Sequence, residues 1–344
     1  MGTSGAARAH RRRAAGAVTL VVVLALVGTA SLAVGARALS PGEVWHGLFG
    51  VPGADQRLSE ITLILRTVRV PRTVLAIAAG AALGVGGALI QGFTRNPIAD
   101  TGLLGVNSGA SFAVVTVILL FGLSNPLQYV WFAFLGAAAA GVVVFGLSSL
   151  GRGGGSPLTL ALTGQGVTVF LAAMTTAIAL SDQASLNALR FWNAGSVAGV
   201  GFEVIWPVTA FIAAGLVLAL TTLPAINLLN LGEDVARGLG VNTTWSRTAG
   251  IVAITVLAGA ATAACGPIAF LGLMVAHVAR YLTGPDYRWL VPYAGLLGAV
   301  VLLACDIVGR VVTRPGELQA GVVVALAGAP FFAALVWRGK FRKA

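Results

Sequence analysis

The chain has 344 residues, of which 57% are hydrophobic and only 10% are charged, and its mean hydropathy is +0.92. In soluble domains about a quarter of all residues are charged. This composition therefore excludes a soluble domain and indicates an all-α, polytopic membrane protein. The net charge of +11 would suit nucleic acid, but the basic residues are scattered without an aromatic-interleaved face. We therefore expect membrane lipids as the partner of the basic ends, and no nucleic acid.

The long apolar runs set the number of spans. A helix needs about 20 residues to cross about 30 Å of hydrocarbon. With this length criterion we predict ten transmembrane helices, at residues 15–36, 72–93, 104–122, 127–149, 158–180, 204–223, 247–264, 268–283, 290–310 and 319–337. The transmembrane domain is then residues 15–337, between a basic N-terminal tail (1–14) and a basic C-terminal tail (338–344).

The distribution of Lys and Arg predicts the orientation. With the N-terminus inside, fourteen of the 22 basic residues fall on the cytoplasmic side, as the positive-inside rule requires. Both termini are then cytoplasmic. The basic start resembles the charged region of a signal peptide, but no clear cleavage site precedes Arg37, so we expect a retained first helix.

A polar, turn-rich break separates the second and third apolar runs, with the sequence RNPIADTGLLG at residues 95–105. Lipid cannot satisfy an irregular backbone, so this segment should lie at a water boundary or line a cavity.

A second polar segment, residues 228–241, carries apolar residues at helical spacing, acids in its first turn and Arg237 later. This pattern predicts a short amphipathic helix whose charges complement its dipole. From the residues alone, such a helix lies on the lipid headgroups.

Arginines on the predicted outer side form two clusters, Arg66, Arg69 and Arg72 before the second span and Arg310 and Arg314 after the ninth. They either cap helix ends and snorkel to headgroups, or form an electropositive rim that docks an acidic partner. Spacing alone favours the first interpretation.

Acids and possible catalytic groups are few. Asp306 stands four residues before Arg310, which predicts an i, i+4 ion pair, and a proton relay through Asp306 and Glu317 is the alternative. The glycine-rich stretch at residues 151–156 lacks the lysine of a phosphate-binding loop. His277, Cys265 and Cys305 lack metal-ligand spacing, so we expect no metal site and no enzymatic activity.

Five segments carry a family resemblance in register. They are RVPRTVLAIAAGAALGVGGALIQGFTRNPIADTGLLGVNSGA (69–110), FWNAGSVAG (191–199), LLNLGEDVARGLGV (228–241), GPIAFLGLMVAHVARYLTGPDYR (266–288) and DIVGRVVTRPGELQAGVVVALAGAPFF (306–332). The chain resembles the FecCD family, the permease subunits of ABC importers for iron-siderophores, haem and cobalamin. The similarity covers about residues 60–335.

The resemblance implies a permease of the bacterial inner (plasma) membrane that pairs with a second permease subunit around a central path. A cytoplasmic ATPase dimer would hold ATP and Mg, a solute-binding protein would deliver the substrate outside, and this chain would carry no cofactor. Iron(III)-siderophore is the expected substrate because it is the commonest in the family, with haem or cobalamin as alternatives.

The resemblance also implies roles for particular residues. The ATPase-coupling helix would contain Leu231, Gly232, Glu233, Asp234, Val235, Ala236, Arg237, Leu239 and Gly240. The cytoplasmic gate would contain Asn96, Pro97, Ile98, Pro157 and Leu158, and binding-protein docking would use Arg69, Arg72 and Arg310. Thr101, Ala276 and Gln319 stand where the family usually has proline, which would soften local kinks.

Two other classes of protein remain as alternatives. An ion-coupled secondary transporter would need a charged site at mid-membrane and usually internal repeats. A membrane-embedded enzyme would need a nucleophile with its base, or metal-ligand spacing. The sequence shows none of these features clearly.

Overall fold

A computed structural model describes residues 3–35, 38–50, 56–123, 125–150, 157–314 and 316–337 of the chain. Within these ranges every regular element is a helix, which confirms the all-α prediction. The elements, in which η1 is a π-helix and η2 a 3-10 helix, are α1 (Thr3–Ala33), α2 (Pro41–Phe49), α3 (Gln56–Ile64), η1 (Leu65–Arg69), α4 (Val70–Thr94), η2 (Thr101–Leu104), α5 (Val106–Phe121), α6 (Pro126–Leu150), α7 (Pro157–Ser181), α8 (Gln183–Asn193), α9 (Phe202–Leu229), α10 (Glu233–Gly238), α11 (Thr243–Cys265), α12 (Leu271–Thr283), α13 (Tyr287–Val312) and α14 (Ala320–Trp337).

The long apolar helices agree with a polytopic membrane protein. Seven helical stretches of the described chain are long and apolar enough to cross a membrane. The apolar parts of α5 and α14 are shorter, and α12 has only 13 residues. Each of the ten predicted ranges overlaps one helix, while the number of spans itself stays a prediction.

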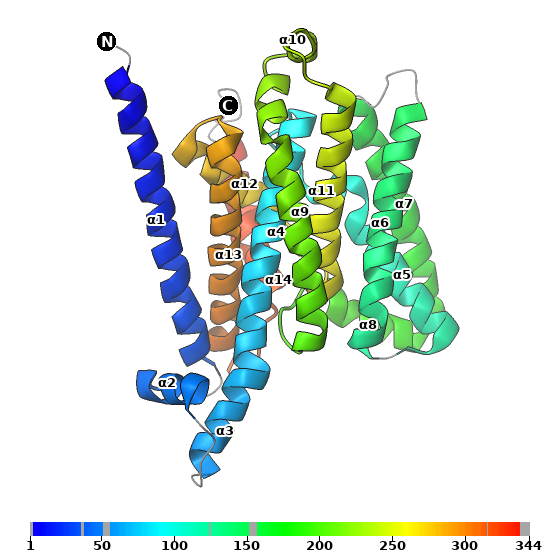
Figure 1. Ribbon diagram of the computed structural model, residues 1–344. Coiled ribbons are helices and arrows are strands. Elements are labelled where there is room, and N and C mark those ends of the chain that lie inside the picture. Colours follow the sequence, from blue (N-terminus) through cyan, green and yellow to red (C-terminus); the bar gives the residue numbers. More distant parts are fainter. Residues whose placement is uncertain are drawn as a thin grey trace.

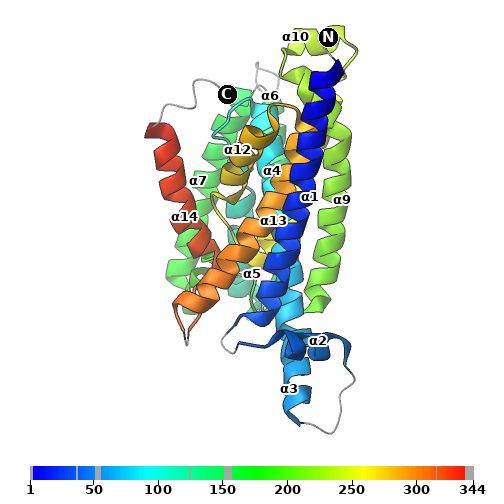
Figure 2. The ribbon, with the colours of Figure 1, turned by 90° about the vertical axis from the view of Figure 1, so that its left-hand side faces the viewer.

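The helix that contains the second predicted span is longer than expected. Helices α3, η1 and α4 run on as one apolar stretch of 38 residues, Arg57–Thr94. The prediction began at residue 72 because Arg66, Arg69 and Arg72 interrupt the apolar pattern. In both ribbon views α3 extends beyond the other long helices and lies beside α2 (Figures 1 and 2).

Helix α4 lies in the middle of the bundle and packs closely on its neighbours through small residues. A Cβ atom on Gly80 would overlap the backbone of Gly298 in α13, and one on Gly87 would overlap the backbone of Gly272 in α12. Membrane helices approach in this way because lipid supplies no hydrophobic drive for their association. These glycines therefore hold α12 and α13 against α4.

The ends of the helices define two faces of the bundle. The first helical turn of α1, the last turn of α14 and the whole of α10 lie on one side, which we call the α10 face (Figures 1 and 2). Helices α2, α3 and α8 lie on the opposite side, the α2 face (Figure 1). The predicted coupling segment is therefore on the same side of the protein as both ends of the described chain.

Candidate functional site

The predicted amphipathic helix is present but short. Gly232, whose φ is 127°, ends the preceding turn, and α10 covers only Glu233–Gly238. The carboxylate of Glu233 forms ion pairs with the guanidinium groups of Arg237 and of Arg247 in α11, each with a nitrogen–oxygen distance of 2.6 Å. Since Arg247 is on the neighbouring long helix, this ion pair ties α10 to α11.

The apolar residues of this segment divide into two groups. Ala236 is fully buried against the bundle. Leu231, Val235 and Leu239 are exposed, with 67%, 48% and 61% of their surface accessible. Three exposed apolar side chains on one short segment form a surface suited to a partner. That the partner is an ATPase stays a prediction.

The predicted polar break is a tight loop between α4 and α5. Arg95 ends α4 in the left-handed region with φ of 49°. The side-chain oxygen of Asn96 accepts from the backbone N–H of Ile98 at 3.1 Å, which is the turn that an asparagine before proline favours. Asp100 caps η2 by accepting from the N–H of Gly102 at 3.0 Å. Ile98, at the tip, is 47% exposed.

Helix α7 contacts this loop at η2. Pro157 is the first residue of α7, and Leu158 is 69% exposed. Further along α7, a Cβ atom on Gly164 would overlap the carbonyl oxygen of Leu103 in η2. The two predicted parts of the gate therefore belong to segments in contact, while their closing of a pathway stays a prediction.

A buried charge cluster lies near the α2 face. Asp306 of α13 pairs with Arg310 at 2.9 Å, which confirms the predicted i, i+4 ion pair. It also pairs with Arg72 of α4 at 2.8 Å. Arg72 reaches a second acid, Glu317, at 2.6 Å. Since Asp306 is held between two arginines, it is neutralised by charge pairing and is a poor proton relay.

The arginines of this cluster also satisfy the end of α1. The last carbonyl groups of a helix lack intrahelical partners and carry partial negative charge. The guanidinium groups of Arg69, Arg310 and Arg314 donate to these carbonyls. The acceptors are Leu32 and Ala33 for Arg69, Ser31 and Val34 for Arg310, and Gly35 for Arg314.

The arrangement corrects the idea of an exposed positive rim. Arg69, Arg72 and Arg310 are 6%, 6% and 3% exposed, and their donors are used by acids and carbonyl groups inside the chain. The pairing of Arg72 with Asp306 was not predicted from the sequence, although the rarity of acids beside apolar spans was a signal for it. Docking of a binding protein at the α2 face stays a prediction.

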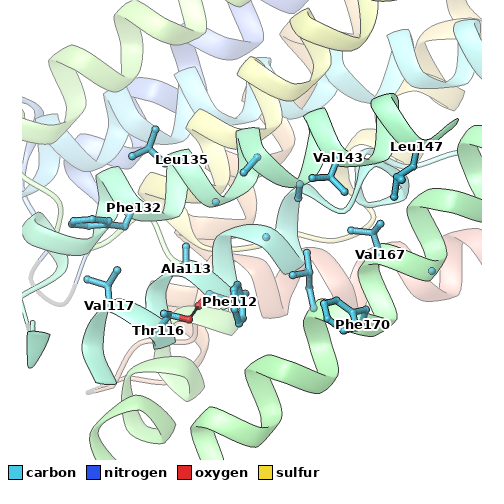
Figure 3. Close-up of a pocket in the computed structure, with 16 residues that line it drawn as sticks. Phe112, Ala113, Thr116, Val117, Phe132, Leu135, Val143, Leu147, Val167 and Phe170 are labelled. Atoms are coloured by element: carbon cyan, nitrogen blue, oxygen red, sulfur yellow. Dashed lines mark hydrogen bonds between the residues drawn. The ribbon is translucent and has the colours of Figure 1, made fainter. Parts of the chain in front are cut away.

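An apolar cavity of about 780 Å³ lies between α5, α6 and α7. Figure 3 shows its wall, with Phe112 and Thr116 from α5, Phe132 and Leu135 from α6, and Phe170 from α7. The lining contains no charged side chain. This cavity therefore suits hydrocarbon and offers no groups to recognise a charged iron chelate.

The remaining candidate groups show no reactive arrangement. In the described part of the chain, no three His, Cys, Asp or Glu residues lie close enough to hold a metal ion. Cys265 and Cys305 are buried free thiols. The ring of His277 packs edge-on against the ring of Phe331, with 6.3 Å between the ring centroids. The glycine-rich stretch 151–156 lies outside the described residues.

Known proteins resemble this chain over nearly its whole length. Residues 22–338 match the model of the FecCD transport family. The ferric enterobactin transport system permease protein FepD of Escherichia coli (strain K12) is 42% identical, over 94% of this chain and 95% of that protein. The hemin transport system permease protein HmuU of Yersinia pestis is 33% identical, over 93% of this chain and 94% of that protein.

A solved structure has the same fold. It is described as a metal-chelate type ABC transporter in an inward-facing conformation, and it aligns with a TM-score of 0.81. The identity is 26%, over 94% of this chain and 98% of that one.

Proposed function

The chain belongs to the FecCD transport family, and we propose that it is the permease subunit of an ATP-driven importer for iron(III)-siderophore complexes. The observation that carries the proposal is the full-length match at 42% identity to a ferric enterobactin permease. A probable siderophore permease, YfiZ of Bacillus subtilis (strain 168), is also 35% identical over 94% of this chain. The chain itself supplies a pathway and docking surfaces, and it hydrolyses no ATP.

The α10 face is the cytoplasmic face in this proposal. The arginine-rich start of α1 and the α10 segment lie there, as the positive-inside rule favours. An ATPase dimer binds α10, and the exposed Leu231 and Leu239 enter its surface. The loop with Asn96, Pro97 and Ile98, together with the start of α7, narrows the path on this side.

A second permease subunit completes the pathway, and a solute-binding protein docks at the α2 face, outside the cell. Helices α6 and α7 have many exposed apolar side chains in the single chain, among them Leu135, Val142, Leu158 and Leu162. Lipid and the second permease subunit cover such surfaces in a membrane assembly.

Haem is the second candidate substrate, because the hemin permease HmuU is 33% identical over nearly the whole chain; cobalamin remains an alternative from the family resemblance. The size of these molecules favours a weakly interacting pathway, with selection by the external binding protein.

Uptake by reconstituted vesicles tests the proposal. The permease, its ATPase and its binding protein are reconstituted, and uptake of a radiolabelled iron-siderophore is compared with uptake of haem and cobalamin. We expect siderophore uptake that requires ATP and stops with an ATPase variant unable to hydrolyse it. Uptake that does not depend on ATP and stops when ion gradients are collapsed would instead indicate a secondary transporter. ATP-driven uptake of haem alone would change the substrate only.

A further inference from the structure

A second cavity, of about 540 Å³, opens among the helix ends near α10. Its wall joins three segments that are distant in the sequence. Arg95 and Pro97 come from the predicted gate loop, Asn230 and Leu231 from the segment that leads into α10, and Arg280 from α12. The cavity is therefore a place where one bound group touches both the coupling segment and the gate loop.

The cavity wall carries a net positive charge, because Arg95 and Arg280 stand against one acid, Asp286. Neither Arg95 nor Arg280 forms an ion pair within the described residues. Arg280 donates to the hydroxyl of Tyr287 at 3.0 Å, which leaves most of its donors unused. The carboxylate of Asp286 accepts hydrogen bonds from the side chain of Asn227 at 2.8 Å and from the backbone N–H of Arg288 at the start of α13. These donors are neutral, so Asp286 offsets one of the two positive charges and one remains.

A buried acceptor at the same wall also lacks a partner. Gln91, in the last turns of α4, lines the cavity and is 2% exposed. Its Nε2 donates to the carbonyl of Leu273 over 3.5 Å, and its Oε1 has no hydrogen-bond partner among the described residues. Buried polar atoms are normally paired, so this oxygen is a free acceptor beside the cavity.

We propose that this cavity receives an acidic loop of the ATPase subunit, whose carboxylate is bound by Arg95 and Arg280. The inference rests on the proposed function and names the chemistry of the partner at that contact. The planar fork of a guanidinium matches a carboxylate. A protein loop also brings backbone N–H groups, one of which pairs with Gln91 Oε1.

The position of the cavity favours an ATPase loop over a lipid headgroup. Leu231 belongs both to the cavity wall and to the exposed apolar surface beside α10, so the cavity continues directly from the proposed docking surface. The bound carboxylate then contacts Arg95, next to Asn96 of the gate loop. Movement of the ATPase at α10 thereby reaches the gate through a direct charge contact.

Binding measurements with charge-neutralised variants test the inference. The permease is placed in nanodiscs of phosphatidylcholine, and its Kd for the purified ATPase dimer is measured for Arg95→Gln and Arg280→Gln. We expect each variant to bind about tenfold more weakly, with a smaller salt dependence, because a desolvated charge pair loses one partner. Arg288→Gln is the matched control, since Arg288 is exposed on the same face and does not line the cavity.

A charge-swap experiment separates the partner from a folding defect. Arg280→Glu is tested against ATPase variants in which each surface Asp or Glu is changed to Arg, and we expect one of them to restore the affinity. If no ATPase variant restores it, or if the Gln variants bind like the wild type, the inference is wrong. The proposed function survives that result as long as the wild-type complex still imports its substrate with ATP.

A lipid arm completes the test. The same variants are prepared in nanodiscs that contain phosphatidylglycerol, and retained lipid is measured by native mass spectrometry. The inference predicts equal lipid retention by wild type and variants. Loss of bound phosphatidylglycerol in Arg95→Gln and Arg280→Gln, with unchanged ATPase affinity, would assign the cavity to a lipid headgroup and overturn the inference.

Discussion

Asp306 joins three helices near the α2 face, because it pairs with Arg72 of α4 and Arg310 of α13, and Arg310 in turn donates to the end of α1. Its side chain is 1% exposed. Burying charges is costly unless each is paired, so the acid and its two arginines stabilise the bundle only as a set. Glu317 differs, since 42% of its side chain reaches solvent.

The Asp306→Asn variant tests this arrangement. It leaves two buried arginines without their shared carboxylate, and we expect a loss of about 3 to 5 kcal/mol of stability, measured by thermal unfolding in detergent. The matched control is Glu317→Gln, which removes the more exposed acid and should cost less than about 1 kcal/mol. Equal losses in the two variants would contradict a special role for Asp306.

At the scale of elements, α10 is the segment whose structure most directly supports a function. The ion pair of Glu233 with Arg247 fixes it to α11, so a force on the exposed leucines that flank it, Leu231 and Leu239, passes to a long helix. The loop at residues 95–105 is the other such element, held by Asn96 and Asp100 as side-chain caps.

The double variant Leu231→Glu, Leu239→Glu should uncouple the ATPase from transport without preventing membrane insertion. Charged side chains remove the apolar contact on the outer side of α10, while Ala236 and the Glu233–Arg247 pair still hold the helix. Co-purification of the ATPase and uptake in vesicles are measured together. Leu231→Met with Leu239→Met keeps the polarity and is the control. Normal uptake by the Glu variant would show that α10 is not the coupling element.

Enlarging the gate loop should slow release into the cytoplasm. Ile98→Trp adds bulk at the exposed tip of the loop, and we expect a several-fold lower uptake rate with unchanged affinity for the binding protein. Ile98→Val serves as the control for the loss of the native side chain. Weaker docking of the binding protein, with a normal uptake rate when that protein is saturating, would place this loop on the outer side.

Elements formed by interactions between residues close in the sequence could be predicted, whereas contacts between distant residues could not. The apolar runs, the break before Pro97 and the charge order around α10 are local signals, and they were read correctly from the sequence. Helices α2, α3 and α8 were missed, because they are short and mix polar with apolar residues. The Arg72–Asp306 pair joins residues 234 positions apart, so no periodicity in the sequence reveals it. The capping of a helix end, which spacing alone favoured for the arginines, is confirmed for Arg69, Arg310 and Arg314.

At the scale of the whole molecule, the two faces of the bundle have opposite characters. The α10 face presents exposed leucines and a cavity whose two arginines form no ion pair among the described residues, whereas Arg69, Arg72 and Arg310 near the α2 face are turned inward. Any acidic partner that approaches the α2 face must therefore compete with the internal acids of the cluster, and Glu317, half in solvent, is the one it would displace.

This competition gives a prediction for docking. If the binding protein places a carboxylate on Arg72, Glu317→Gln removes the internal competitor and should raise the association rate several-fold, with a stronger dependence on salt, because charge pairs at a rim mainly set the rate of encounter. Association is measured on nanodisc-embedded importer at two salt concentrations. Arg57→Gln, a charge change on the same face at a side chain that is 67% exposed, is the control. Unchanged association in Glu317→Gln, with transport retained, would leave Arg72 and its neighbours with a purely structural role at the end of α1.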